Sequence, residues 1–402
     1  MIALLRHSSY IAARSLRHSW KRSALLAIVL GVSLGLPVAL TTLLAQASTD
    51  MRARAAVSPL LLGARGSEAD LVFGTLFFAA QPARGLAVRD LARVEAESLA
   101  TAIPIAVGAT ARKTPVVGTT IDYFAATAQT ARGRMFATIG ECVVGANAAR
   151  ALGGVNPGDR FFTDPASLSD LAGVFPLELT VTGVLAPTQS PDDDAIFVDL
   201  RTMWTIRGLG HRHDEPAQSA TPGAVIGTVA TASGDHKIAG EALPIARAAA
   251  EGVASDFHFH GSTDDFPIDG AIVRPVDAKA QAILLGRFTG TDERLQLMRP
   301  DLFTERVLER IFGVGRVLGA VAGAIALLVA LVATSTFALS IRLRADELAL
   351  MRRLGASRGR VAVFIAAEAM ALVCAGLAIA TAIAACTPLA APFVLRAASG
   401  GL

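Results

Sequence analysis

Three long apolar runs set the pattern of hydrophobic and polar positions along this chain. The first, Ser23 to Ala47, contains no charged residue, and the second, Val317 to Ile341, follows Arg316. The third, Val361 to Ala385, contains one charge, Glu368. A helix needs roughly 20 apolar residues to cross a bilayer. We therefore expect transmembrane spans at residues 23–47, 313–341 and 361–386.

The segment before the first run, residues 1–22, has an amphipathic pattern. One face of a helix there would carry Leu5, Ala12, Leu16 and Trp20, and the other Arg14, Arg17 and Lys21. This pattern predicts a helix lying in the membrane interface. A cleaved signal peptide is the alternative, because Ala45-Gln46-Ala47 resembles a cleavage site. The apolar run exceeds the usual signal core of roughly 7–15 residues, which favours a retained anchor.

The long insertion between the first two runs, residues 48–312, has a mixed α and β texture. Segments 177–187 and 194–200 have the length and apolar alternation of strands. Residues 141–161 read as strand, helix and an Asn-Pro-Gly-Asp turn, and residues 266–288 as strand followed by helix. The expected fold is thus an α-helical membrane protein with a large α+β domain. Within that domain, we expect residues 210–223 to form a flexible linker.

Basic residues predict the orientation. Residues 1–22 contain five Arg or Lys and no acid, and residues 342–360 contain six Arg. Short basic segments stay in the cytoplasm, whereas long translocated domains are largely exempt from this rule. We expect a multi-pass protein with a cytoplasmic amino terminus, an extracytoplasmic insertion 48–312 and a cytoplasmic segment 342–360.

Composition excludes several functions. The chain of 402 residues is 52% hydrophobic and 18% charged, with a net charge of +3 and only two Trp and two Tyr. No basic stripe with interleaved aromatic residues is present, so we expect no nucleic-acid partner. The three cysteines indicate no disulfide framework.

The segment "DELALMRRLGASRGR", residues 346–360, reads as a short capped helix. Asp346 is placed to cap it, Arg352 and Arg353 would complement the helix dipole, and Gly355 would supply a left-handed stop. Leu350 and Leu354 would lie along one side. An ordinary basic loop is the alternative, but a loop needs neither a cap nor an apolar row.

This segment, extended to "DELALMRRLGASRGRVAVFIAAEA", resembles the signature of the FtsX-like, MacB-type ABC permease family. "VVGANAARALGGVNPGDRF" is similar to a recurrent piece of that family's outer domain. The order of elements also fits the family. The resemblance implies a MacB-type extracytoplasmic domain, a bacterial inner (plasma) membrane location, and a cytoplasmic ABC ATPase on a separate subunit that binds ATP.

In that family the segment between the second and third spans is a coupling helix that docks on the ATPase. The resemblance carries this role to Glu347, Leu350, Met351, Leu354 and Gly355. The family also has a fourth span, whereas residues 387–402 read as a short tail containing Pro388, Pro392 and Arg396, so we expect no fourth span here.

Small residues at four-residue spacing predict close helix packing. They are Gly31 and Gly35 in the first run and Gly315, Gly319 and Gly323 in the second. Three spans are too few to enclose a path, so we expect a homodimer surrounded by membrane lipid. Glu368 has two interpretations: a costly buried functional acid, or one bonded to a neighbouring helix or reaching the interface.

Five of the seven histidines fall between residues 211 and 260. Alternate residues of a strand share a face, so His258 and His260 could bind one ion, with carboxylates such as Asp264 nearby. Histidine pairs also occur in solvated loops without a ligand. "DFHFHGSTDDFPIDGAIVRP" resembles a histidine-bearing subset of the family associated with zinc uptake, which implies Zn²⁺ at His211, His213, His258, His260 and Asp264. It also implies an extracytoplasmic metal-binding or carrier partner.

The leading hypothesis is the membrane subunit of an ATP-driven transporter whose cargo is a divalent metal, a metal complex or its carrier protein. The alternatives are export of a peptide or lipoprotein, and a mechanotransmitting signal protein that regulates an extracytoplasmic partner. The sequence contains no G-x-x-x-x-G-K-[ST], H-E-x-x-H or G-x-S-x-G. We therefore expect no catalytic site on this chain.

Overall fold

The computed structural model describes residues 20–78, 85–125, 127–164, 176–212, 225–231, 234–239, 257–259, 261–290 and 294–398, with three isolated positions before residue 20. The chain divides into two compact units. One comprises Met1–Asp50 with Arg306–Leu402, and the other comprises Met51–Glu305. The predicted interfacial helix at residues 1–22 lies almost entirely outside the described residues.

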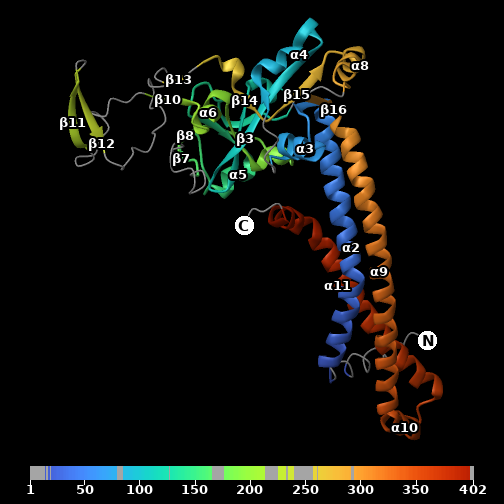
Figure 1. Cartoon of the computed structure of the whole chain (residues 1–402). Coiled ribbons are helices and arrows are strands. Elements are labelled where there is room, and N and C mark those ends of the chain that lie inside the picture. The colour runs from blue at the N-terminus through green and yellow to red at the C-terminus, as the bar shows by residue number, and fades with distance from the viewer. Residues whose placement is uncertain are drawn as a thin grey trace. The chain divides into compact units, whose positions relative to one another are not determined.

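The first unit is helical (Figure 1). Its elements are α2 (Trp20–Val57), α9 (Pro300–Leu343), the short α10 (Ala345–Arg353) and α11 (Arg358–Ala398), of which α2 and α9 extend into the second unit. Among the described residues, α2, α9 and α11 are each long and apolar enough to cross a membrane, and each contains an 18-residue stretch whose mean hydropathy is 2.3, 2.5 and 2.3, respectively. The helices extend beyond the apolar runs. Helix α2 continues to Val57, α9 begins at Pro300, and α11 continues through the predicted tail to Ala398.

Glycine allows α2 and α11 to approach closely. A Cβ atom on Gly31 would lie 2.6 Å from Cβ of Ile379, and one on Gly35 would lie 3.0 Å from Cα of Ala380. The contact is reciprocal, because a Cβ on Gly376 would lie 2.9 Å from a methyl of Leu30. Bilayers supply no hydrophobic force between helices, so this direct contact is what holds the pair together.

The glycines of α9 differ from one another. A Cβ on Gly315 would lie 3.3 Å from Cδ1 of Leu44 on α2, which is a close contact. A Cβ on Gly319 or Gly323 would meet no described atom within 4 Å. The predicted ridge therefore meets α2 at one end and is open along the rest of its length, within the part of the chain that the structure describes.

The second unit is built on a ten-stranded mixed sheet in the order β16-β1-β15-β3-β4-β9-β6-β8-β5, with β7 also paired to β8. Its strands are β1 (Leu60–Ala64), β3 (Ala100–Ala111), β4 (Thr114–Thr119), β5 (Thr130–Gly133), β6 (Glu141–Val144), β7 (Arg160–Phe162), β8 (Glu178–Leu185), β9 (Ile196–Asp199), β15 (Gly270–Pro275) and β16 (Leu295–Met298). The pairs β4–β9 and β6–β8 are parallel, and the others are antiparallel.

Three two-stranded sheets complete the β structure. They pair β2 (Leu86–Ala87) with β14 (Pro267–Ile268), β10 (Gly210–Arg212) with β13 (Phe257–Phe259), and β11 (Val225–Thr231) with β12 (Gly234–Ala239). The predicted linker 210–223 therefore begins with a strand and otherwise lies outside the described residues.

Short helices lie between the strands. They are α3 (Glu68–Phe77), α4 (Ala92–Glu95), α5 (Ala146–Ala151), α6 (Leu200–Ile206) and α8 (Ala278–Arg287), with 3₁₀ turns η1 (Val88–Leu91), η2 (Ala96–Ser98), η3 (Ile121–Tyr123), η5 (Pro191–Asp194) and η7 (Thr263–Asp265). The core contains buried residues of the strands and of α6, including Val116, Ile196, Leu179 and Met203.

The sequence patterns of this unit predict its elements well. Segments 177–187 and 194–200 contain β8 and β9, and segment 141–161 contains β6 and α5. The predicted turn is present, since the backbone N–H of Asp159 donates to the carbonyl of Asn156 at 3.0 Å. Segment 266–288 contains β14, β15 and α8, and Asp277 caps α8 by accepting from the N–H of Ala280. The predicted α+β character is confirmed.

Candidate functional site

The short helix α10 (Ala345–Arg353) occupies the segment singled out in the sequence. Arg352 and Arg353 fall in its last turn, as predicted. Gly355 has a φ of +95°, the left-handed conformation that stops the helix, and the N–H of Ala356 bonds to the carbonyl of Met351. The predicted boundary at this end is therefore confirmed.

The predicted cap at the other end of α10 is wrong. The helix begins at Ala345, two residues earlier than expected, and the carbonyl of Arg344 already accepts from the N–H of Leu348 at 3.1 Å. Arg344 is the N-cap residue and makes no side-chain capping bond. Asp346 instead lies in the first turn, where its charge interacts favourably with the helix dipole.

The predicted coupling residues form the exposed surface of α10 and the turn after it. Leu350 and Leu354, four positions apart, are 57% and 80% exposed. Glu347 and Gly355 are also exposed, whereas Met351 is half-buried. Exposed leucines next to arginines on one short helix form a surface suited to contact with another protein.

Arg344 connects α10 to α11. Its guanidinium Nη1 donates to Oε1 of Glu368 at 3.1 Å and to Oε2 at 3.3 Å, and its Nε donates to Glu347 at 2.9 Å. The side chain of Glu368 is 5% exposed and that of Arg344 is 24% exposed. The guanidinium also lies 5.8 Å from the ring centroid of Phe364. Glu368 is therefore buried, as the first interpretation has it, and bonded to the cap residue of a neighbouring helix, as the second has it.

The end of α2 is anchored in the second unit by Arg54. Its Nη2 donates to Oδ1 of Asp192 at 2.8 Å and to the hydroxyl of Tyr123 at 2.6 Å, and its Nε donates to the carbonyl of Leu76 at 3.0 Å. Tyr123 in turn donates to Asp192 at 2.5 Å. Burial raises the pKa of Tyr123, so its hydroxyl keeps its proton. Each charged or polar group in this cluster is paired, as burial requires.

The predicted metal ligands are only partly described. Strands β10 and β13 pair His211 directly opposite His258. His213 and His260 lie outside the described residues. Asp264 is exposed in η7, where its N–H donates to the hydroxyl of Ser262. Among the described side chains there is no group of three or more that could hold a metal ion.

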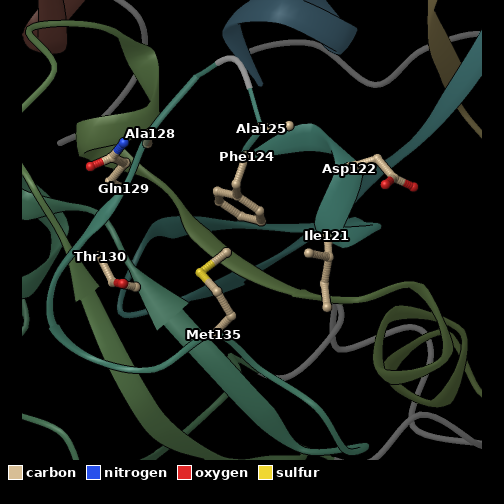
Figure 2. A pocket seen from close by; sticks show the side chains of 8 residues that line it. All are labelled: Ile121, Asp122, Phe124, Ala125, Ala128, Gln129, Thr130 and Met135. Carbon is tan, nitrogen blue, oxygen red and sulfur yellow. The ribbon is translucent and has the colours of Figure 1, made fainter.

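A shallow hollow lies on the second unit beside strand β5 (Figure 2). It has a volume of about 420 Å³, and apolar side chains of Ile121, Phe124 and Met135 contribute to its lining. Asp122, Gln129 and Thr130 add polar groups. No sequence pattern indicated this hollow, because its residues come from η3, from the first residue of β5 and from the segments on either side of β5.

Two arginines with internal partners, the buried Arg54 and the half-buried Arg344, were not predicted from the sequence. In the sequence, Arg344 is one of six arginines between the second and third runs, and nothing local distinguishes it from the others. The available signal is Glu368, the lone acid in the third run, which requires a partner. Arg54 counted as an extracytoplasmic charge, and its partner Asp192 is 138 positions away. The available signal for Arg54 is its place a few residues after an apolar run, in a segment that contains no Gly or Pro to end the helix.

Two protein-family models match parts of this chain. The profile of the MacB-like periplasmic core domain matches residues 23–234, and the profile of the FtsX-like permease C-terminal domain matches residues 319–387. No curated protein matches the chain. The two profiles cover the first span with most of the sheet domain, and most of α9 together with α10 and α11 as far as Thr387. The chain belongs to the FtsX-like, MacB-type family of ABC transporter permeases, membrane subunits of systems whose ATPase is a separate chain.

Proposed function

We propose that α10 is the contact through which a cytoplasmic ABC ATPase acts on this membrane subunit. The exposed Leu350 and Leu354 carry this proposal, because they form an apolar surface that no described residue covers. Glu347 adds an acidic group, and Gly355 fixes the direction in which the chain leaves the helix. We further propose that the protein is multi-pass in a bacterial inner membrane, with a cytoplasmic amino terminus.

Arg344 supports a role for α10 in passing motion onward. It bonds at once to Glu347 on α10 and to Glu368 on α11. A displacement of α10 would therefore act on α11 through a side chain held at both ends. Such a rigid connection between two elements is what a switching subunit requires.

A homodimer completes the proposal. The open glycines of α9, Gly319 and Gly323, would let a second copy approach closely. Their counterparts on α2, Gly31 and Gly35, are already occupied by α11 within the chain. We accordingly assign the second copy to α9 and the intrachain contact to α2.

The experiment is site-specific photo-crosslinking in native membranes, with benzoyl-phenylalanine in place of Leu354. We expect a cross-link to a protein with a phosphate-binding G-x-x-x-x-G-K-[ST] loop. The matched control carries the same group at Val276, which is 69% exposed in the second unit. A cross-link to the same ATPase from Val276, or none from Leu354, would contradict the proposal.

A role in divalent metal handling is a second candidate, supported by the pairing of His211 with His258 across β10 and β13. Directly opposed residues of an antiparallel pair share one face of the sheet. Imidazole and carboxylate groups suit Zn²⁺, and Asp264 and Asp265 follow His258 closely in the sequence. An extracytoplasmic metal-binding or carrier protein would then be the partner that delivers or receives the ion.

Zinc titration of the full chain in detergent, followed by calorimetry, tests this candidate. Saturable binding should fall at least tenfold in affinity for His211→Ala with His258→Ala. His236→Ala, on β12, is the control and should leave binding unchanged. Equal binding by all three proteins would rule out the β10–β13 site, and peptide or lipoprotein export or signal transmission would become the leading alternatives.

A further inference from the structure

The hollow beside strand β5 combines a buried floor with an exposed rim. Phe124 is 7% exposed and packs edge-to-face on Phe197 with centroids 5.2 Å apart, so its ring is held in place. Ile121, by contrast, is 56% exposed at the rim. Figure 2 shows Phe124 and Met135 between Ile121 on one side and Thr130 on the other. Ile121 at the rim and Phe124 and Met135 at the floor give the hollow an apolar side.

Strand β5 is the last strand of the sheet order and pairs with β8 alone among the described strands. The carbonyl of Gln129 accepts from the N–H of Ala186 at 2.9 Å, so residue 129 directs its backbone toward β8. Successive residues of an antiparallel strand alternate in this direction, and the register of β5 shifts only after Thr130, between Thr130 and Arg132. Thr130 therefore directs its N–H and carbonyl outward, and the same residue lines the hollow.

An open strand edge next to an apolar hollow matches one mode of recognition. An extended peptide adds to the edge through its backbone, and alternate side chains enter neighbouring pockets. The geometry points to such a site here: we propose that an extended segment of a separate extracytoplasmic polypeptide pairs with β5 at Thr130 and places a bulky apolar side chain over Phe124. The exposed carboxylate of Asp122 at the rim favours a lysine or arginine nearby in that segment.

The turn that lines the hollow is the turn that holds the end of α2. Tyr123 lies between Ile121 and Phe124 in sequence, and its hydroxyl bonds to both Arg54 and Asp192. A peptide bound over Phe124 would therefore contact the turn that contains Tyr123, one of the partners of Arg54. This inference does not depend on the proposed ATPase contact at α10, because it concerns the second unit alone.

The test uses the full chain in detergent and fluorescein-labelled ten-residue peptides. Threonine and valine alternate in each peptide, with lysine at both ends and phenylalanine, leucine or alanine at the centre. We expect saturable binding by fluorescence anisotropy with the apolar centres, at least tenfold weaker with alanine. Methylation of the backbone nitrogens that face β5 should also weaken binding at least tenfold, because it removes the donors for strand pairing.

Protein variants locate the site. Ile121→Asp should weaken binding at least tenfold, and the fluorescence of the buried Trp204 checks that the domain remains folded. Ile283→Asp, on the exposed side of α8, is the matched control and should bind as the parent does. No saturable binding at millimolar peptide, equal binding of the methylated peptides, or equal loss in both variants would overturn the proposal. Self-association of the chain that Ile121→Asp abolishes would assign the hollow to a second copy and also overturn it.

Discussion

Arg54 and Asp192, 138 positions apart, form a two-pronged ion pair in which neither side chain is more than 4% exposed. Arg54 belongs to the same helix as the first apolar run, and Asp192 to the 3₁₀ turn η5. The pair is satisfied by Tyr123 and by the carbonyl of Leu76. The residues just beyond the first span are thereby fixed to the core of the sheet domain.

Replacement of Arg54 by methionine should destabilise the second unit by about 3–5 kcal/mol, because Asp192 would remain buried without its counter-charge. Chemical unfolding followed through Trp204 measures this. Arg52→Met is the control: its pair with Glu305 at 2.8 Å is 47% and 51% exposed, so its loss should cost less than about 1 kcal/mol. Equal losses in the two variants would contradict the assignment of Arg54 as the anchor.

Replacement of Arg344 by methionine should release α10. Hydrogen exchange of the α10 amides is the measurement, and it should accelerate at least about tenfold, which corresponds to roughly 1.4 kcal/mol. Glu368→Gln keeps the shape of the acceptor and one neutral hydrogen bond, so a smaller acceleration is expected. Glu347→Gln is the control, because that side chain is 69% exposed. If the Arg344 and Glu347 variants behave alike, the bond to Glu368 does not hold α10.

The sequence predicted the helices and strands better than it predicted which distant residues pair with one another. Apolar runs, alternation in β8 and the glycine stop at Gly355 are local signals, and each predicted its element. The start of α10 was misplaced because a capping residue and a first-turn acid look alike in sequence, as Asp346 shows. The ion pairs of Arg54 and Arg344 join residues distant in the chain, and no local pattern encodes such a pairing. Likewise, the pairing of His211 with His258 depends on strand register, whereas spacing along the chain suggested His258 with His260.

The contact between α2 and α11 should tolerate no side chain at Gly31. Gly31→Ala places a methyl 2.6 Å from Ile379 and 2.8 Å from the carbonyl of Gly376, so the helices must separate. We expect a loss of about 1–3 kcal/mol, measured as a lower midpoint of thermal unfolding in detergent. Gly323→Ala is the matched control, since its methyl would meet no described atom within 4 Å. An unchanged midpoint for Gly31→Ala would mean that the two helices are not in contact.

Glu141 should contribute to stability at neutral pH and lose that contribution in acid. Hydrogen bonds from the Arg134 guanidinium, and then from the N–H groups of Ala137 and Thr138, lower its pKa from 4.5 to about 2. Because the folded pKa lies below the unfolded value, the contribution is complete above about pH 4.5 and is lost as the pH falls toward 2.

Unfolding of Glu141→Gln as a function of pH tests this assignment. The variant should be less stable than the parent by roughly 1–2 kcal/mol at pH 7, and the difference should narrow between pH 4.5 and 2. Glu178→Gln, whose contact with Arg160 is 3.9 Å long, is the control and should change stability less. A difference between parent and Glu141→Gln that stays constant down to pH 2 would contradict the lowered pKa.

Because of its length, α9 has an amino-terminal part and an apolar part that respond differently to dissolved salt. Its 44 residues span about 66 Å at roughly 1.5 Å per residue, whereas the hydrocarbon layer is about 30 Å thick. The excess includes the amino-terminal part, which carries Asp301, Glu305, Arg306, Glu309, Arg310 and Arg316. Contacts there, such as Arg52 with Glu305, are weakened by dissolved ions, while the apolar part is shielded from them. A rise in ionic strength would therefore weaken the ion pairs at the amino-terminal end of α9 and have less effect on its apolar part.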